Sequence, residues 1–224
     1  MSLYVCGDTH GGEDLHKLSS KRFPARDLTK NDYLLVCGDF GAVWDLSATD
    51  FYLRRWYRDK PWTTLFVDGN HENHDLLATY PISEWNGGKV QIISDSIIHL
   101  MRGQVYEIDG HKIFTMGGAS SHDKIFRKAG ISWWAKELPS EEEFAEAQKN
   151  LAAHGNQVEY IFTHCAGGSI QDQLKPHYEK DTLTAFLDEL EAIEYKHWYF
   201  GHYHMDKDLD DKHTALFDRV IKLW

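Results

Sequence analysis

Short runs of apolar residues recur along the chain, and each is followed by turn-forming or polar residues. Five of these runs have the length of buried strands, and they cover residues 3–6, 33–37, 64–67, 160–163 and 198–200. Between the first three runs, residues 13–21 and 47–58 have helical character. The alternation predicts an α/β layered domain, in which functional loops collect at the carboxyl ends of the strands.

The middle of the chain has a different pattern, because its apolar runs are separated only by short turns. These runs are residues 90–93, 97–101, 105–108 and 112–116, with Asp109-Gly110 as a hairpin signal between the last two. The pattern predicts one antiparallel meander. After His204, two further apolar runs, residues 214–217 and 220–224, are candidates to close a second sheet.

Two segments in the second half of the chain have the signals of amphipathic helices. In residues 140–154, Ser140 and Glu143 form a capping box, and one face carries Phe144, Ala147, Leu151 and Ala152. In residues 181–192, Asp181 is a candidate cap, and the apolar stripe consists of Leu183, Phe186, Leu187 and Leu190.

Length and composition exclude several classes of protein. The 224 residues fall within the range of one large α/β domain, and no linker or internal repeat divides them, so we expect a single domain over residues 1–224. No apolar run approaches the roughly 18 residues that span a bilayer, which argues against a transmembrane role. The formal net charge of −11 gives no global attraction for nucleic acid or anionic lipid. A polyanionic partner would need a local positive site.

The amino-terminal region and the cysteines indicate a compartment. No basic stretch followed by an apolar segment opens the sequence, which argues against a signal peptide. Cys6, Cys37 and Cys165 are odd in number and stand at the ends of apolar runs, where a free thiol behaves as a small hydrophobic residue. We therefore expect a cytoplasmic protein.

Polar clusters stand directly after the five predicted strands. They are Gly7-Asp8-Thr9-His10, Gly38-Asp39, Gly69-Asn70-His71-Glu72, His164 and Gly201-His202-Tyr203-His204. One such cluster alone is more often an ordinary turn or a hydrogen-bonded histidine. Five in one chain converge on one edge of the fold if the strands run in parallel, which favours a shared site.

The residue types in these clusters favour a metal centre. Imidazole and carboxylate together suit Mn, Fe, Zn, Co or Ni, and the lack of cysteine argues against a structural thiolate zinc site. The spacing of Asp8 with His10, and of His202 with His204, lets alternate residues face one side of an extended strand end. Seven ligands are too many for one transition-metal ion. Two divalent ions with two carboxylates would leave a net charge of about +2, which suits phosphate binding and the activation of water.

In this order, the clusters resemble the signature of the calcineurin-like metallophosphoesterase family: Asp-x-His, Gly-Asp, Gly-Asn-His-Asp/Glu, a lone His and Gly-His-x-His. The resemblance covers residues 7–204. It implies an α/β fold with a two-sheet β-sandwich flanked by helices. It also implies one metal ion held by Asp8, His10 and His204, a second held by Asn70, His164 and His202, and Asp39 as the bridge. His71 would be the catalytic residue that contacts the phosphate and aids the leaving group.

One departure from the family concerns the residues after Asp39. The protein phosphatases and diadenosine tetraphosphate hydrolases of the family follow Gly-Asp with two residues and then Asp-Arg-Gly, whereas residues 42–44 are Ala-Val-Trp here. Without that phosphate-binding Arg, the sequence is assigned to no subfamily. A diester needs less positive charge than a monoester dianion, so we expect a preference for diesters, with Trp44, Trp133 or Trp134 stacking on a base or aryl group.

The loop after the predicted meander carries weaker signals. Arg127 and Lys128, with the tryptophans at residues 133–134, are candidates for a lid that brings charge to a phosphate. Packing of the paired tryptophans is the alternative. For His122 and Asp123, a surface loop is favoured over an approach to the rim of the site.

The sequence as a whole predicts a dinuclear metal-dependent phosphoesterase. Its cofactors would be two divalent transition-metal ions (Mn, Fe, Zn, Co or Ni, with Mn preferred), and its partner a small phosphorylated substrate. The acidic chain disfavours long nucleic acid, and no membrane partner is expected. The alternatives are a protein phosphatase or nuclease of the same family, and a non-catalytic metal-binding scaffold for protein contacts. Loss of His71 or of a ligand would mark the scaffold, and the sequence keeps all of them.

Overall fold

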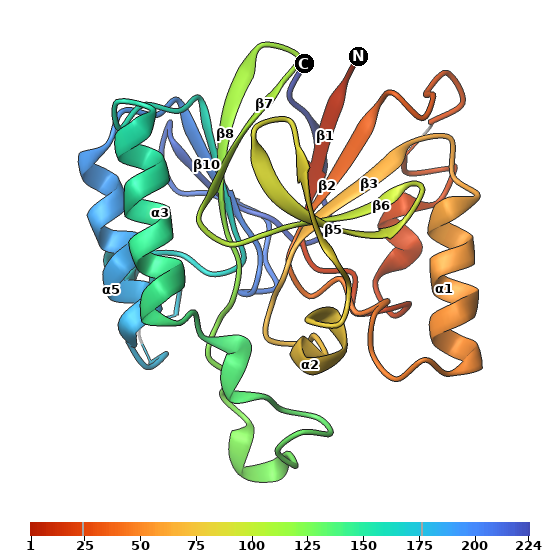
Figure 1. Cartoon of the computed structure of the whole chain (residues 1–224), viewed down its shortest axis with the longest axis horizontal. Coiled ribbons are helices and arrows are strands. Elements are labelled where there is room, and N and C mark those ends of the chain that lie inside the picture. Colours follow the sequence, from red (N-terminus) through yellow and green to blue (C-terminus); the bar gives the residue numbers. More distant parts are fainter. Residues whose placement is uncertain (24, 176) are drawn as a thin grey trace.

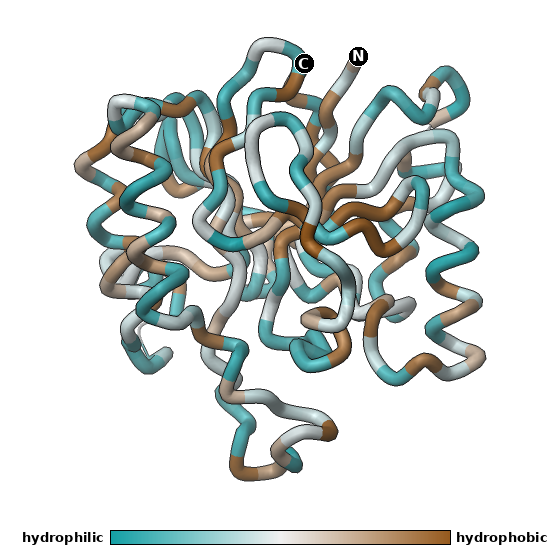
Figure 2. The backbone as a smooth tube through the Cα atoms, in the orientation of Figure 1, coloured by the Kyte–Doolittle hydropathy of each residue, from teal (hydrophilic) through white to brown (hydrophobic). Residues whose placement is uncertain are grey.

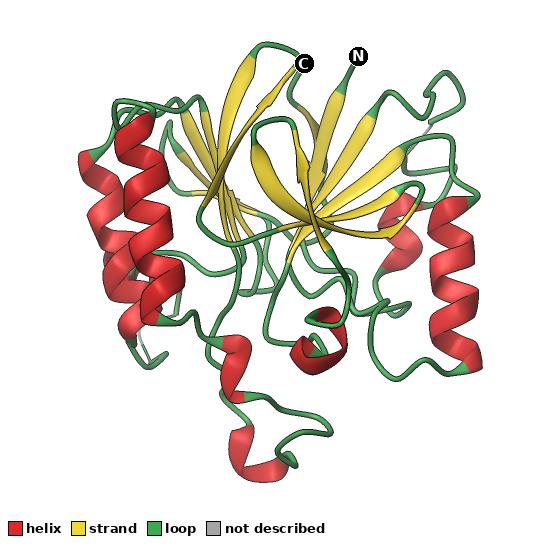
Figure 3. Cartoon of the chain, in the orientation of Figure 1, coloured by secondary structure: helices red, strands yellow, loops and turns green. Residues whose placement is uncertain are grey.

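Two β-sheets packed face to face form the centre of the protein, with helices against both outer faces (Figures 1 and 3). The computed structural model describes residues 1–23, 25–175 and 177–224. This arrangement confirms the predicted α/β architecture, a two-sheet β-sandwich flanked by helices.

The first sheet has seven strands in the order β13-β1-β2-β3-β6-β5-β4. Its parallel strands are β1 (Leu3–Cys6), β2 (Tyr33–Cys37), β3 (Thr63–Val67) and β6 (Ile97–Leu100). β13 (Val220–Lys222) pairs antiparallel with β1. Beyond β6, β5 (Gly88–Ser94) pairs antiparallel with β6, and β4 (Ile82–Trp85) pairs antiparallel with β5. Because β1, β2 and β3 are parallel, the polar clusters that follow them lie at one edge of the sheet.

The second sheet has six strands in the order β11-β12-β10-β9-β8-β7. Its parallel strands are β12 (His213–Ala215), β10 (His197–Phe200), β9 (Tyr160–Thr163) and β8 (His111–Met116). The short β11 (Lys207–Asp208) and β7 (Gln104–Ile108) are its antiparallel edges. His164 and His202 follow the parallel neighbours β9 and β10.

Helices cover the outer face of each sheet. In Figure 1, α1 (Ala48–Arg58) lies on one side, and α3 (Glu141–Ala153) and α5 (Thr182–Glu189) lie on the other. The predicted capping box of Ser140 and Glu143 is present at α3, and Asp181 caps α5 as predicted. The helix predicted over residues 13–21 is only a short 3₁₀ helix, η1 (Leu15–Leu18). Two further short helices, α2 (His74–Leu77) and α4 (Gly168–Leu174), lie outside the predicted segments.

The strands carry continuous apolar runs because both of their faces are buried. In β2, Leu35 and Cys37 face the core between the sheets, whereas Leu34 and Val36 pack with the residues under α1. Figure 2 shows the hydrophobic segments gathered along the strands, with more hydrophilic positions on the surrounding helices and loops. No helix within the described ranges combines the length and hydrophobicity that a membrane span requires.

The single meander predicted over residues 90–116 is wrong. β5 and β6 form one antiparallel pair in the first sheet, whereas β7 and β8 form another in the second sheet, joined by the predicted Asp109-Gly110 turn. Both turn residues have positive φ, 53° and 82°. The chain changes sheets at residues 101–103. There, Gly103 (φ 68°) packs so closely on α3 that a Cβ would lie 2.8 Å from the Cβ of Ala147.

The end of the chain is divided between the two sheets. Residues 213–215 join the second sheet, starting one residue before the expected run and ending two residues before its end, but residues 220–222 pair with β1 in the first sheet. The prediction that both runs close a second sheet is therefore wrong for the last strand. Local hydrophobicity identifies a strand, but it does not say which neighbour the strand will pair with.

One segment, residues 117–140, projects below the sandwich between β8 and α3 in Figure 1, and is called the arm below. It contains the 3₁₀ helices η2 (Lys124–Phe126) and η3 (Ala135–Glu137). Ile125 and Phe126 at its tip are 84% and 85% exposed, whereas Glu137 at its base is 1% exposed. The arm is therefore solvated at one end and built into the protein at the other.

Candidate metal centre

The seven predicted metal ligands come together where the strands of both sheets end. They are called the donor cluster below: Asp8, His10, Asp39, Asn70, His164, His202 and His204. Donor atoms lie within 4.8 Å of one another in two sets drawn from this cluster, Asp8 with His10 and His204, and Asp8 with Asp39 and His164. A third set joins His71 to His10 and Asp39.

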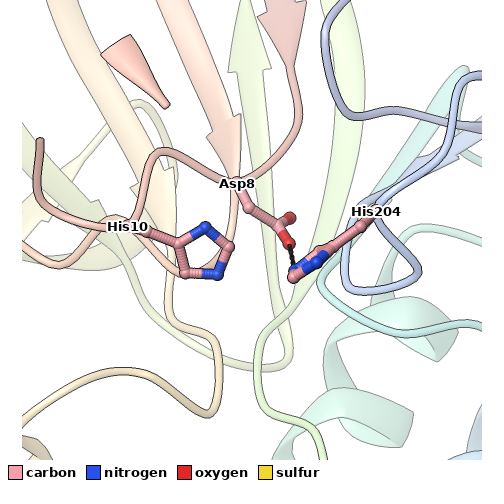
Figure 4. A group of neighbouring side chains, drawn as sticks. All are labelled: Asp8, His10 and His204. Atoms are coloured by element: carbon pink, nitrogen blue, oxygen red, sulfur yellow. Dashed lines mark ion pairs between the residues drawn. The ribbon is translucent and has the colours of Figure 1, made fainter. Parts of the chain in front are cut away.

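One side of the donor cluster is built on Asp8, directly after β1. Nε2 of His204 lies 3.2 Å from Oδ2 of Asp8, and the rings of His10 and His204 are 4.9 Å apart (Figure 4). Asp8 is fully buried, whereas the His204 side chain is 53% exposed. This side of the cluster therefore opens to solvent.

The other side is built on His164, directly after β9. Its Nε2 lies 3.1 Å from Oδ1 of Asn70 and 3.2 Å from Oδ1 of Asp39. The ring of His202 is 5.0 Å from the ring of His164. The second oxygen of Asp39 lies 3.2 Å from Nε2 of His10, so this one carboxylate contacts both sides of the cluster.

Hydrogen bonds behind three of the donors fix the direction in which their side chains face. Nδ1 of His10 bonds to Asp14 at 2.7 Å, and Nδ1 of His164 donates to the carbonyl of Cys37 at 2.8 Å. Both contacts leave Nε2 turned toward the cluster, which is the arrangement that orients histidine ligands in metal sites. The amide of Asn70 donates to Ser121 Oγ at 3.2 Å, so its oxygen faces His164.

Four residues of the donor cluster adopt backbone conformations that are rare for side chains other than glycine. His10, Asp39, His202 and His204 have φ values of 42°, 46°, 67° and 50°. Each such residue costs on the order of 1–3 kcal/mol, so the surrounding structure must hold it in place. The amide of His10 donates to the carbonyl of Asp39, and the amide of His202 donates to the carboxylate of Asp8.

Two glycines explain why the motifs begin as they do. Gly38 has φ 86°, and a Cβ there would lie 2.2 Å from Nδ1 of His164. At Gly69, a Cβ would lie 2.1 Å from Oδ1 of Asp39. The glycine before each donor therefore allows the backbone of one strand end to approach the side chain of another.

Buried charges of opposite sign dominate the electrostatics of the cluster. Burial opposes the ionisation of Asp39, but His164 and His10 hold the pKa of this carboxyl well below its usual range. Burial likewise disfavours charged imidazoles, yet the Asp39 carboxylate raises the pKa of His164 to about 10 and that of His10 to about 9. Burial and the nearby His164 lower the pKa of His202. The two buried carboxylates thus attract positive charge to this point.

The donor cluster fits transition-metal ions in both chemistry and spacing. Its donors are carboxylate and amide oxygens and imidazole nitrogens, which Mn, Fe, Zn, Co and Ni accept. Two ligands that share one ion at about 2.1 Å lie about 3.0–3.4 Å apart. The separations of 3.1–3.2 Å between neighbouring donor atoms on both sides of Asp39 agree with this range.

His71 lies beside the donor cluster and meets the arm. Its amide donates to Oδ1 of Asp39 at 2.7 Å, and its Nε2 lies 2.9 Å from Nη2 of Arg127. Burial, opposed by Asp39 and reinforced by Arg127, lowers the pKa of His71.

His122 is exposed, but its ring is 5.4 Å from that of His202, so the arm reaches the rim of the site. Asp123 pairs with Arg127 instead.

A cavity of about 800 Å³ opens next to His10 and His71. Trp44 and Tyr52 give it aromatic walls, and Glu13 and Asp45 are among its other lining residues. Trp44 therefore lines the cavity, whereas Trp134, which packs edge-on against it at 5.3 Å, is itself buried. The cavity has the volume of a small-molecule site.

Several supporting residues escaped the sequence analysis. Asp14 follows His10 by four residues, a spacing that could have been noticed. Glu72 belongs to a recognised motif, and its buried carboxyl accepts the amide of Phe40 at 2.7 Å; burial and Asp39 raise the pKa of Glu72. Ser121 and Glu137, which support Asn70 from the arm, carry no signal in the sequence.

Comparisons with known proteins identify a family for this chain. The family model described as calcineurin-like phosphoesterase matches residues 1–206 of the 224. No curated protein matches the chain. Among solved structures, phosphopantetheinyl hydrolase from Mycobacterium tuberculosis is 14% identical, with a TM-score of 0.41 over 96% of this chain and 88% of that one. The sulfate thiohydrolase SoxB from Thermus thermophilus is 13% identical, with a TM-score of 0.45 over 97% and 51%.

Proposed function

The chain belongs to the calcineurin-like phosphoesterase family, and we propose that it is a dinuclear metal-dependent enzyme that hydrolyses a small phosphate ester. The position of Asp39 carries this proposal. One of its oxygens lies 3.2 Å from Nε2 of His10, and the other lies 3.2 Å from Nε2 of His164. A buried carboxylate between two groups of histidines suits a ligand shared by two neighbouring ions.

The donor cluster divides into two ligand sets in this proposal. Asp8, His10 and His204 hold one ion, and Asn70, His164 and His202 hold the other, with Asp39 shared. When bound, such ions supply positive charge for the phosphate and activate water. The protein keeps the donors facing inward through Asp14, the carbonyl of Cys37, and Ser121.

His71 is proposed as the catalytic residue beside the ions. It belongs to neither ligand set, and its amide bond to Asp39 fixes it at the edge of the donor cluster. Its ring lies 5.4 Å from that of His10 and lines the same cavity. A ring nitrogen at this position can contact a phosphoryl oxygen, or hold the proton that the leaving alcohol needs.

The cavity supports a small ester as the substrate. An alcohol group placed there would meet the aromatic faces of Trp44 and Tyr52 and the carboxylates of Glu13 and Asp45. Aromatic faces favour an aryl group or a base, and carboxylates disfavour further negative charge on the alcohol. A protein phosphatase or nuclease would need to present its ester at the same cavity, and the net charge of −11 disfavours a long polyanion.

A substrate panel tests this proposal. The purified protein is stripped of metal, reloaded with Mn, Fe, Zn or Mg, and assayed with p-nitrophenyl phosphate and bis(p-nitrophenyl) phosphate. Hydrolysis of at least one ester should disappear on chelation and return with Mn. Full metal loading without turnover of any ester would instead favour the non-catalytic scaffold.

A further inference from the structure

The loop after Asp39 brings no basic side chain to the site. Residues 40–44 are Phe-Gly-Ala-Val-Trp, and Ala42 and Val43 are 0% and 1% exposed within the core beneath α1. Trp44 lines the cavity. A positively charged side chain that contacts a phosphate at the donor cluster would therefore have to come from another segment.

The arm places such a cation against His71. Nη2 of Arg127 lies 2.9 Å from Nε2 of His71, and Nη1 lies 3.3 Å from Nδ1 of the same ring. A neutral imidazole accepts at only one nitrogen, so at most one of these contacts is a hydrogen bond. Both terminal nitrogens of the guanidinium nevertheless lie within 3.3 Å of a ring nitrogen of His71. A ring nitrogen of His71 in turn lies within 4.8 Å of donor atoms of His10 and Asp39.

Contacts within the arm hold this guanidinium in position. Nε of Arg127 pairs with Asp123 at 2.6 Å, and Nη1 also donates to the carbonyl of Ser132 at 3.2 Å. The Arg127 side chain is 13% exposed. Asp123 is 50% exposed, so solvent screens the charge that it sets against Arg127. The edge formed by the two terminal nitrogens remains turned toward His71.

The base of the arm is tied to the loop that follows β3 and carries His71. Asp68, directly after β3, pairs with Arg102, which also donates to the carbonyl of Lys136 at 2.9 Å. Ser121 links Asn70 to the buried carboxylate of Glu137. Arg127 thus belongs to a segment that is anchored on both sides of its exposed tip.

The other basic residues of the arm tip do not share this position. Lys124 pairs with Glu137 at 2.9 Å and with Ser120 at 2.8 Å. Lys128 is exposed. Among these three arm residues, Arg127 alone has a described contact with His71.

We propose that Arg127 is the phosphate-binding arginine of this site and that it favours the doubly charged phosphate of a monoester over a diester. The inference rests on the proposed function. It reverses the preference for diesters that was expected because Val43 stands where related phosphatases have a phosphate-binding arginine. A guanidinium offers two parallel N–H groups to two phosphate oxygens, and a monoester dianion gains more from them than a diester monoanion. A phosphate beside His71 would accept hydrogen bonds from the N–H groups of Arg127 that face the imidazole ring in the free protein.

The experiment compares Arg127→Ala and Arg127→Lys with Lys128→Ala as the matched control. Two quantities are measured on Mn-loaded protein: the Kd of inorganic phosphate by calorimetry, and kcat/KM for p-nitrophenyl phosphate and its bis ester. Arg127→Ala should weaken phosphate binding and monoester turnover by roughly 10- to 100-fold, with a few-fold effect on the diester. Arg127→Lys should recover part of the loss, and Lys128→Ala should leave both quantities unchanged.

The outcomes separate this proposal from the proposed function. If wild type hydrolyses neither ester, the proposed function fails, while the phosphate Kd still tests Arg127. If Arg127→Ala and Arg127→Lys keep the wild-type phosphate Kd and monoester-to-diester ratio, the role of Arg127 is overturned. Equal metal content in all variants ensures that weaker phosphate binding reflects the guanidinium and not a lost ion.

Discussion

The strand ends and the arm bring polar groups to the same site, but they are held by different means. Asp8, Asp39 and His164 follow strands of the two sheets and are at most 1% exposed. Their positions are fixed by sheet hydrogen bonds, close glycine contacts and strained backbone turns. The arm is a loop with two 3₁₀ helices, anchored at its base and exposed at its tip.

This difference matches two kinds of chemistry. Metal ligands must be placed to within a few tenths of an ångström, and the parallel strands at the centre of the two mixed sheets provide that rigidity. A substrate contact such as the one proposed for Arg127 tolerates a more adaptable carrier. The comparison leads to an expectation that experiments can test. Substitutions at the strand ends should alter metal binding, and substitutions on the arm should chiefly alter binding of the ester.

The largest effect is expected at the strand ends, from Asp39→Asn. Removing the charge that faces both His10 and His164 should deplete both ions and reduce hydrolysis to background, because the shared carboxylate offsets the repulsion between them. Elemental analysis and the ester assay measure both results. Asp45→Asn, which alters an exposed carboxylate at the cavity, is the control and should keep its metal. Retention of both ions and of the full rate by Asp39→Asn would show that the carboxylate is not shared.

The next effect is expected at His71, which lies between the two regions. His71→Ala should keep the wild-type metal content and lower kcat by roughly 10²- to 10⁴-fold, the range for a positioned acid or phosphate contact. His16→Ala, at an exposed histidine, should change neither quantity. If His71 donates a proton, the loss should shrink for aryl esters with good leaving groups. Depletion of metal in His71→Ala would instead place this residue among the ligands.

A smaller effect is expected where the arm supports the donor cluster, at Ser121. Its hydroxyl accepts from Asn70 at 3.2 Å and donates to Glu137 at 2.7 Å. Ser121→Ala should weaken binding of one ion by roughly 10- to 100-fold, as for other groups that orient a ligand, and leave the second ion bound. Metal titration by calorimetry measures both steps, with Ser120→Ala as the neighbouring control. Unchanged affinity would mean that the arm has no part in placing Asn70.

The same comparison explains how far the sequence predicts the structure. The strand ends are encoded locally: an apolar run, a glycine and a polar donor lie within a few residues of one another. β1, β2 and β9 begin and end at the predicted residues, and the donors that follow them converge as expected. The resemblance to a family added the proposed division of these donors between two ions.

The remaining features depend on contacts between distant segments. Ser121 lies 51 residues from Asn70. Arg127, which the sequence marks as a lid candidate but does not place against His71, lies 56 residues from it, in a loop without hydrophobic periodicity. The exchange of sheets between β6 and β7 is equally non-local. Each strand has an apolar pattern, but the pattern is the same for either sheet. Tertiary packing, including the close contact of Gly103 with α3, determines which sheet each strand joins.

The central claim is that the donor cluster holds two metal ions that share Asp39. Elemental analysis of the wild-type protein, reloaded with excess Mn and freed of unbound ions, tests it most directly. Two ions per chain are predicted, because the seven donors form two sets around one carboxylate. At most one ion per chain under these conditions would contradict the account.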